Sequence, residues 1–230
     1  MPRQQDGRAP TLTGPVRVVL ADDAPLVREG VALVLREAGI EVLEQVGDGR
    51  ALLGAVARHR PDVAVIDVRM PPTGTVEGLQ AAAVIQRTHP ATGVLLLSNH
   101  CETQHVQELL DEAPAGVGYL LKERVVDTAS FVTAVRAVAQ GSCAVDPQVL
   151  DALLAHRRVR ASLLALTVRE QEVLAAMAVG ASNYALSRRF GVSLKTVESH
   201  IASIFRKLNL TDDVDEHRRI KAVLAHLRST

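Results

Sequence analysis

The chain has 230 residues with equal numbers of acidic and basic side chains, 26 of each, and a composition typical of globular proteins. Hydrophobic residues make up 47% and aromatic residues only 2%, so leucine, valine and alanine must build the core. The two cysteines, Cys101 and Cys143, exclude a disulfide framework and a cysteine-based metal site. No apolar run approaches the ~18 residues of a membrane span, and the polar N-terminus predicts no signal peptide. We expect a soluble, cytoplasmic protein with no membrane partner.

Charge is divided unevenly along the chain. Residues 1–146 hold 13 Lys and Arg against 18 Asp and Glu, a net charge of −5, whereas residues 147–230 hold 13 against 8, a net charge of +5. This division favours an acidic signalling half and a basic half that faces nucleic acid. Chance variation over a balanced surface is the alternative, and the charge difference alone does not exclude it.

The first half of the chain alternates strand and helix patterns. Residues 1–14, rich in proline, glycine and charge, are expected to be disordered. Alternation at this spacing predicts an α/β fold, a doubly wound parallel sheet of (βα)5 type over residues 15–141. The expected strands are 16–21, 40–46, 63–67, 93–97 and 117–121, and the expected helices are 25–39, 50–59, 79–88, about 103–112 and 127–139.

Asp67 ends the short apolar strand Val63–Asp67, just before Met70 and two prolines. Open α/β sheets place their active sites at the carboxyl ends of their strands. A lone carboxylate there could simply cap the strand, but Asp22 and Asp23 follow another apolar strand in the same way. Three carboxylates at one sheet edge repel each other unless a cation neutralises them, and hard oxygen ligands suit Mg²⁺.

Five residues in this order, Asp22, Asp23, Asp67, Ser98 and Lys122, resemble the pocket of a CheY-like receiver domain. The resemblance implies that a sensor histidine kinase leads to phosphorylation of Asp67. It also implies that Ser98 and Lys122 bind the phosphoryl oxygens as the catalytic pair, and that Tyr119 follows the switch. The implied Mg²⁺ ligands are Asp22, Asp23, Asp67 and the backbone carbonyl of Arg69. The loop 72–77 lacks the family's usual Asp-Gly, and Glu77-Gly78 stands in its place.

Gly141 and Pro147 punctuate the chain after the predicted sheet. Residues 148–156 have a helical pattern, and the basic run Arg157–Arg160 is typical of a solvated connection. We therefore predict a linker over residues 142–161.

From Thr167 onward the pattern is helical only, which predicts an all-α domain over residues 162–230 with four helices. Thr167 and Glu170 form a capping-box pattern at the start of the first helix, and Gly180 ends it. Ser182 caps a second helix, 183–190, and Ser193 caps a third, 194–208, after a turn at Gly191; Thr211 is expected to cap the last. Two helices joined by a tight glycine turn predict a helix-turn-helix.

The third helix of this domain has two distinct faces. At helical spacing, Val197, Ile201, Ile204, Phe205 and Leu208 fall in one apolar sector. The opposite side presents Lys195, Ser199, Ala202 and Arg206, a stripe with low bulk at its centre and a cation near each end. A solvated helix face is the alternative. The excess of five basic residues over one acid in residues 182–210 favours insertion into the DNA major groove.

The stretches Leu166–Leu174, Gly180–Asn183 and Val192–His200 resemble the LuxR-type helix-turn-helix, and the whole chain resembles a NarL/FixJ-type two-component response regulator. This implies a transcription regulator that binds an inverted-repeat operator as a homodimer. The stripe on the last helix, which can also pack on its own domain, is the expected dimer contact: Ile220, Val223, Leu224 and Leu227. The expected DNA-binding residues are Lys195, Thr196, Glu198, Ser199, His200, Ala202, Arg206 and Lys207.

Two other functions compete with this one. A phosphatase could use Asp67 as its nucleophile, but Arg69 occupies the place where such enzymes carry a second acid, so we expect no enzyme. A DNA-binding regulator could instead use the receiver only for protein contacts, without phosphorylation.

Overall fold

The computed structural model describes residues 14–99, 116–210 and 218–227. The expected helix at 103–112, the expected cap at Thr211 and the N-terminal segment up to residue 13 lie outside the described residues. The chain divides into two compact units, Met1–Leu153 and Leu154–Thr230.

The first unit contains a parallel sheet with the order β2-β1-β3-β4-β5-β6. The expected α/β doubly wound fold is confirmed, with one addition. A sixth strand of two residues pairs Ala144 with Gly118 and Val145 with Tyr119. It is too short to show a period in the sequence, which is why it was not expected. The strands are β1 Arg17–Ala21, β2 Glu41–Val46, β3 Val63–Asp67, β4 Gly93–Ser98, β5 Val117–Leu121 and β6 Ala144–Val145.

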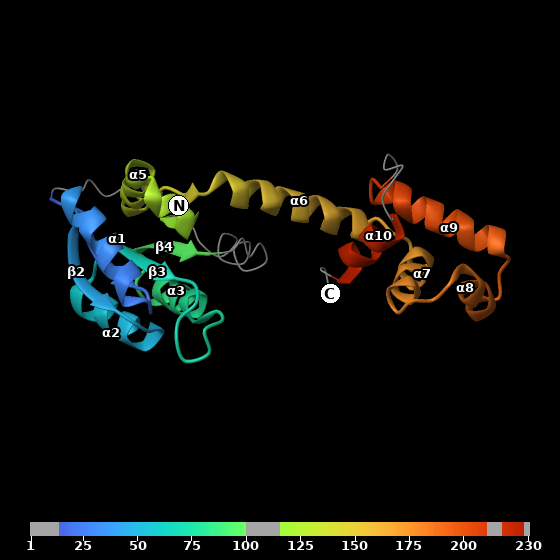
Figure 1. Cartoon of the computed structure of the whole chain (residues 1–230), viewed down its shortest axis with the longest axis horizontal. Coiled ribbons are helices and arrows are strands. Elements are labelled where there is room, and N and C mark those ends of the chain that lie inside the picture. Colours follow the sequence, from blue (N-terminus) through green and yellow to red (C-terminus); the bar gives the residue numbers. More distant parts are fainter. Residues whose placement is uncertain (1–13, 100–115, 211–217, 228–230) are drawn as a thin grey trace, which may run out of the picture. The chain divides into compact units, whose positions relative to one another are not determined.

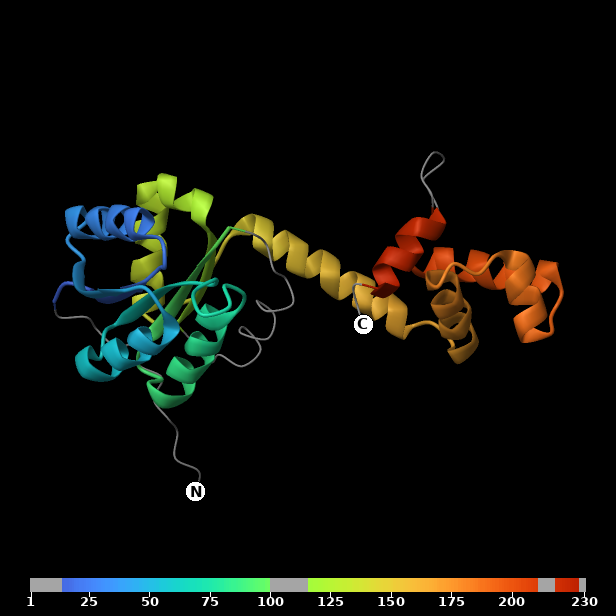
Figure 2. The same cartoon turned by 60° about the horizontal axis from the view of Figure 1, so that its bottom comes forward.

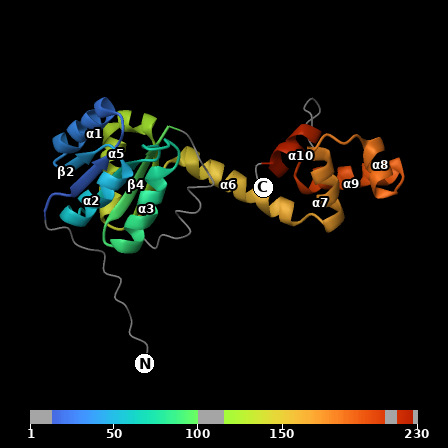
Figure 3. The same ribbon diagram turned by 90° about the horizontal axis from the view of Figure 1, so that it is seen from below.

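Helices cover both faces of this sheet (Figure 1). The helices α1 (Pro25–Glu37) and α5 (Thr128–Ala139) bury one strand face, and α2 (Gly49–His59) and α3 (Glu77–Thr88) bury the other, as Figure 3 shows from below. Successive strand residues alternate between the two cores because side chains on a strand have a period of two. This explains why the central strands are apolar throughout. A short 3-10 helix, η1 (Lys122–Val126), follows β5.

Helix α6 runs without a break from Pro147 to Leu164, so the basic connection predicted at Arg157–Arg160 is helical. A run of arginines can form the solvent face of a helix, and no glycine or proline interrupts residues 148–164. Val149 and Leu153 near its start are buried in the same core as α2 and α3.

The second unit is helical, with α7 Val168–Ala178, α8 Asn183–Phe190, α9 Leu194–Lys207 and α10 Arg218–Leu227 (Figure 2). The three expected N-caps are confirmed: Thr167 forms a complete capping box with Glu170, and Ser182 and Ser193 each accept a backbone N–H. Gly180 and Gly191 adopt the left-handed conformation that ends a helix. Among the described residues, no helix combines the length and apolarity needed to cross a membrane.

Candidate functional site

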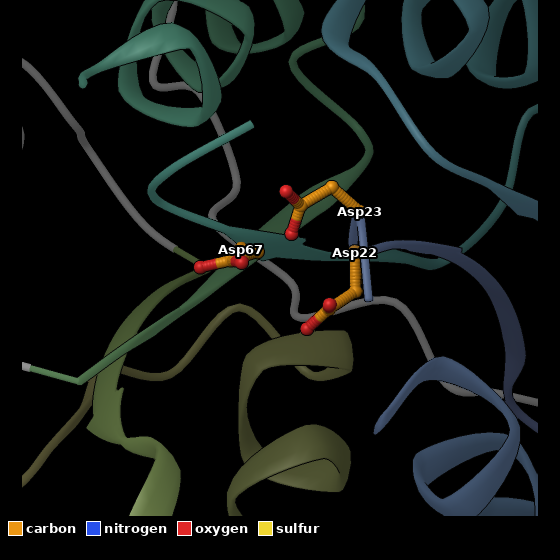
Figure 4. A group of neighbouring side chains, drawn as sticks. All are labelled: Asp22, Asp23 and Asp67. Carbon is orange, nitrogen blue, oxygen red and sulfur yellow. The ribbon is translucent and has the colours of Figure 1, made fainter. Parts of the chain in front are cut away.

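Three carboxylates meet at the carboxyl end of the sheet. Asp22 and Asp23 follow β1, Asp67 ends β3, and one oxygen of each lies within 4.8 Å of the others (Figure 4). Asp22 and Asp67 are buried, whereas Asp23 is exposed. The parallel pairing of β1 with β3 produces this cluster, because it brings the ends of both strands to the same edge.

Lys122 links two of these carboxylates. Its Nζ donates to Oδ2 of Asp22 and to Oδ2 of Asp67, each at 2.7 Å. Burial lowers the pKa of Lys122, but the two hydrogen bonds and the nearby negative charges outweigh it and raise the pKa above its ordinary value. Burial also raises the pKa of the Asp67 carboxyl, and Asp22 adds to that shift, while the Lys122 ammonium opposes it. A lysine and an aspartate 100 positions apart in the sequence thus form one charged unit.

Ser98 and Tyr119 come from β4, which pairs with β3, and from β5, the next strand along the sheet. Ser98 is the last residue of β4 and is buried, next to the end of β3 in the parallel sheet. Tyr119 of β5 is fully buried and lies opposite Leu96 of β4. The structure therefore brings Asp22, Asp67 and Ser98 to one sheet edge with Lys122, as the sequence predicted, while the movement of Tyr119 stays a prediction.

Gly78 and Arg28 also support the site, and no sequence motif pointed to Arg28. A Cβ atom at Gly78 would lie 1.9 Å from the backbone oxygen of Asp67, so only glycine lets α3 approach the end of β3. The proposed role of Glu77-Gly78 in place of Asp-Gly has a steric basis here. Arg28 of α1 donates to the backbone carbonyl of Asp22 and anchors the acidic pair, a contact that no motif predicted.

The donor set at this edge fits Mg²⁺. Three carboxylates from two strands supply hard oxygen ligands with incomplete enclosure, which leaves room for water and for a phosphate oxygen. Oδ1 of Asp67 accepts from the backbone N of Arg69 at 3.3 Å, so the chain turns closely around the carboxylate after β3. The carbonyl of Arg69 as a further ligand stays a prediction.

The candidate nucleic-acid interface lies on α9. Val197, Ile201 and Ile204 are buried in the core of the second unit, which fixes the orientation of the helix. The face opposite them is exposed, as the periodicity predicted. Its exposed members include six of the expected DNA-binding residues: Lys195, Thr196, Glu198, Ser199, Ala202 and Arg206.

The other two expected DNA contacts are half-buried, and one has partners inside the domain. Nζ of Lys207 donates to Oε2 of Glu170 at 2.6 Å and to the carbonyl of Ala165 at 3.1 Å. Oε1 of Glu170 accepts from the hydroxyl of Ser203 at 2.7 Å, so this buried carboxylate joins the start of α7 to the end of α9. Burial raises the pKa of Glu170, but its hydrogen bonds from Lys207, Thr167 and Ser203 together outweigh burial and lower the pKa to about 2.

Residues from neighbouring helices frame the exposed stripe of α9. Asn183 of α8 and Arg218 of α10 line a hollow together with Ser199, Ala202 and Arg206. Neither Asn183 nor Arg218 was expected in the site, because a single-helix periodicity carries no signal for residues on adjacent helices. On α10, Ile220, Leu224 and Leu227 are exposed, whereas Val223 is half-buried against the core of its own unit.

Two family models match this chain. The first, described as a response regulator receiver domain, matches residues 18–136, and the second, described as bacterial regulatory proteins of the luxR family, matches residues 164–218. The first match covers the sheet with its carboxylates, and the second covers α7 to α9.

Relatives and solved structures agree with both models. A probable transcriptional regulatory protein NarL of Mycobacterium tuberculosis is 38% identical over 200 residues, which cover 86% of this chain and 89% of the relative. The receiver domain structure of a putative NarL from the same organism is 38% identical with a TM-score of 0.50 and covers 56% of this chain and 98% of that domain. RcsB from Salmonella enterica is 22% identical, with a TM-score of 0.53 over 93% of this chain and 100% of that one, and shares the fold. The chain thus belongs to the two-component response regulators that act in transcription, with a receiver domain followed by a LuxR-type DNA-binding domain.

Proposed function

We propose that phosphorylation of Asp67 controls the binding of this regulator to DNA. The observation that carries the proposal is the buried Asp67 carboxylate, held by Lys122 beside Asp22 and Ser98 at the sheet edge. A domain with an exposed basic stripe on α9 follows in the same chain.

In the phosphoryl transfer, an oxygen of Asp67 attacks phosphorus and forms a new P–O bond. The bond from phosphorus to the donor breaks, whether the donor is a phosphohistidine of a sensor kinase or acetyl phosphate, and the donor leaves with the electron pair. Mg²⁺ held by Asp22, Asp23, Asp67 and the carbonyl of Arg69 would neutralise negative charge on the transferred group. The Lys122 ammonium and the Ser98 hydroxyl bind the oxygens of the phosphoryl group, which gives Asp67 additional negative charge and acceptor oxygens.

On DNA, the stripe on α9 enters the major groove and its flanking cations contact phosphates. One such module buries a small interface, so two copies on an inverted repeat bind more tightly than one. Ile220, Leu224 and Leu227 on α10 supply an exposed apolar contact for the homodimer. The RcsB structure was solved on a promoter in the presence of a phosphomimetic, which supports the same order of events by analogy.

The test uses the full chain with acetyl phosphate and Mg²⁺. We expect the intact mass to rise by one phosphoryl group in the wild type and not at all in Asp67→Asn. Asp151→Asn is the matched control, because Asp151 is exposed on α6 and should leave phosphorylation unchanged. DNA selected from a random library should then bind the phosphorylated wild type more tightly than the unphosphorylated chain.

The outcomes separate the candidate functions. Uptake of the phosphoryl group by Asp67→Asn at the wild-type rate would contradict the assignment of Asp67. Equal DNA affinity in both states of the wild type would favour the phosphorylation-independent regulator instead.

A further inference from the structure

Arg124 and Asp146 form an ion pair beside the phosphorylation pocket, although neither residue belongs to the pocket. Nε of Arg124 donates to Oδ2 of Asp146 at 2.8 Å, and the side chain of Asp146 is 0% exposed against 41% for Arg124. A buried carboxylate needs partners, because an uncompensated charge in the interior is costly. Because its carboxylate is buried, this pair is worth more than an ordinary ion pair between two exposed side chains.

One end of this pair is tied to the pocket. Arg124 lies in η1, two residues after Lys122, whose ammonium holds both Asp22 and Asp67. The backbone N of Asp146 donates to the carbonyl of Tyr119 at 2.9 Å. Tyr119 is the residue that is expected to follow the switch. A displacement of Lys122 or Tyr119 thus reaches Asp146 through η1 and through β5.

The other end of the pair is the start of α6. Oδ1 of Asp146 accepts from the backbone N of Gln148 at 2.9 Å, and the carbonyl of Asp146 accepts from Leu150, so Asp146 caps the helix. Val149 and Leu153 hold the first turns of α6 in the core of the first unit, and the helix continues to Leu164 in the second unit. The two oxygens of one carboxylate therefore join η1 to the N-terminus of α6.

We propose that the Arg124–Asp146 ion pair is a positioning element that carries the phosphorylation state of Asp67 to the first turn of α6. The inference rests on the proposed function, in which Asp67 is phosphorylated and DNA binding depends on it. When Lys122 turns from the two carboxylates to the phosphoryl oxygens, η1 moves with it, because η1 is a single short helical segment that begins at Lys122. Arg124 then shifts the capping carboxylate, and the start of α6 responds.

Two substitutions separate this role from simple capping. Asp146→Asn keeps an oxygen that can cap α6 but removes the charge, and Arg124→Ala removes the partner from the other side. In the full chain, hydrogen exchange of the amides of residues 148–153 is measured with and without acetyl phosphate and Mg²⁺. We expect the wild type to show a phosphorylation-dependent change that both variants lose, although both still take up the phosphoryl group.

The double variant completes the cycle. If the pair acts as one unit, Arg124→Ala with Asp146→Asn loses no more than either single variant, and the ratio of DNA affinities between the two phosphorylation states falls toward one in all three. Arg136→Ala is the control, because Arg136 on α5 also makes a 2.8 Å hydrogen bond, to the carbonyl of Ala38, yet lies outside this connection. Arg124→Lys, which keeps a cation at the same place, should restore part of the response.

A merely structural pair gives a different result. The variants would then unfold at lower denaturant concentration but keep two wild-type properties: the phosphorylation-dependent change in hydrogen exchange and the ratio of DNA affinities between the phosphorylation states. Retention of both properties would overturn the proposal. Failure of the proposed function would appear in the wild type itself, as absence of phosphoryl uptake or of any difference in DNA binding.

Discussion

The phosphorylation pocket and the α9 stripe are built in opposite ways. The pocket gathers side chains from the ends of three strands and from η1, and its central members Asp22, Asp67 and Ser98 are buried. The stripe lies on one helix, and most of its members are exposed. The pocket depends on the whole sheet, whereas the stripe depends only on the orientation of α9.

This difference determines how each site tolerates change. In the pocket, Lys122 binds Asp22 and Asp67 at once, so a substitution alters its neighbours and its effect is not additive. On the stripe, side chains are separated by whole helical turns, so substitutions should act one at a time. The prediction with the largest effect concerns the pocket, and the one with the smallest concerns the stripe.

Gly78→Ala should damage the pocket without removing any of its charged residues. The new Cβ would lie 1.9 Å from the oxygen of Asp67 and 2.9 Å from Cα of Val68, so backbone must move. We expect a loss of about 3 kcal/mol or more in the free energy of unfolding, above the usual cost of overpacking because the clash is with backbone, together with slower phosphorylation by acetyl phosphate.

Gly30→Ala is the matched control for that substitution. A Cβ at Gly30 in α1 would meet no atom within 4 Å, so the change should stabilise the helix slightly, by about 0.5–1 kcal/mol. Denaturant unfolding and the time course of intact mass measure both variants. Normal stability and normal phosphorylation in Gly78→Ala would show that the pocket does not depend on the close packing of α3 against β3.

Glu170→Gln tests whether the exposed stripe also depends on a buried charge. Glu170 binds Lys207, Ser203 and the backbone N of Thr167, so the neutral variant should lose about 2–3 kcal/mol of stability near neutral pH. Glu172→Gln is the control, because the Glu172 side chain is 50% exposed and pairs with Arg169 at i,i+3. It should cost about 0.5 kcal/mol or less.

The effect of Glu170 should depend on pH in a defined direction. Its pKa is lowered from 4.5 to about 2 in the folded chain, so its contribution is complete above the unfolded pKa and is lost as pH falls toward about 2. The stability difference between the wild type and Glu170→Gln should therefore shrink between pH 4.5 and 2. A difference that stays constant over this window would contradict the folded-state pKa.

The sequence predicted the sheet and the pocket well, because both leave strong local signals. Apolar strands that end in Asp67 or are followed by Asp22 and Asp23 indicate the parallel sheet and its active edge, and the resemblance to receiver domains adds Ser98 and Lys122. Gly78 stands in the sequence as part of a loop motif, whereas its steric role follows only from the approach of α3 to β3.

The parts that the sequence did not reveal are those that depend on distant neighbours. Strand β6 has two residues and no period, and α6 extends through arginines that looked like a linker. The absence of glycine and proline from residues 148–164 is the sequence signal for one continuous helix there. Lys207 is one of the five basic residues counted over residues 182–210, and such a count cannot show that a flexible side chain turns toward Glu170.

The smallest expected effects separate Lys207 from the other cations of α9. Lys195 and Arg206 are exposed, so Lys195→Ala and Arg206→Ala should each weaken binding to any duplex and reduce the slope of log affinity against log salt by about one. Lys207→Ala should instead lower stability and change the salt slope much less, because its ammonium is held by Glu170 and Ala165. Fluorescence anisotropy with a random-sequence duplex at several salt concentrations measures all three variants, with denaturant unfolding in parallel. If Lys207→Ala reduced the salt slope as much as Arg206→Ala while its stability stayed normal, Lys207 would be a phosphate contact and the stripe would be wider than its exposed residues indicate.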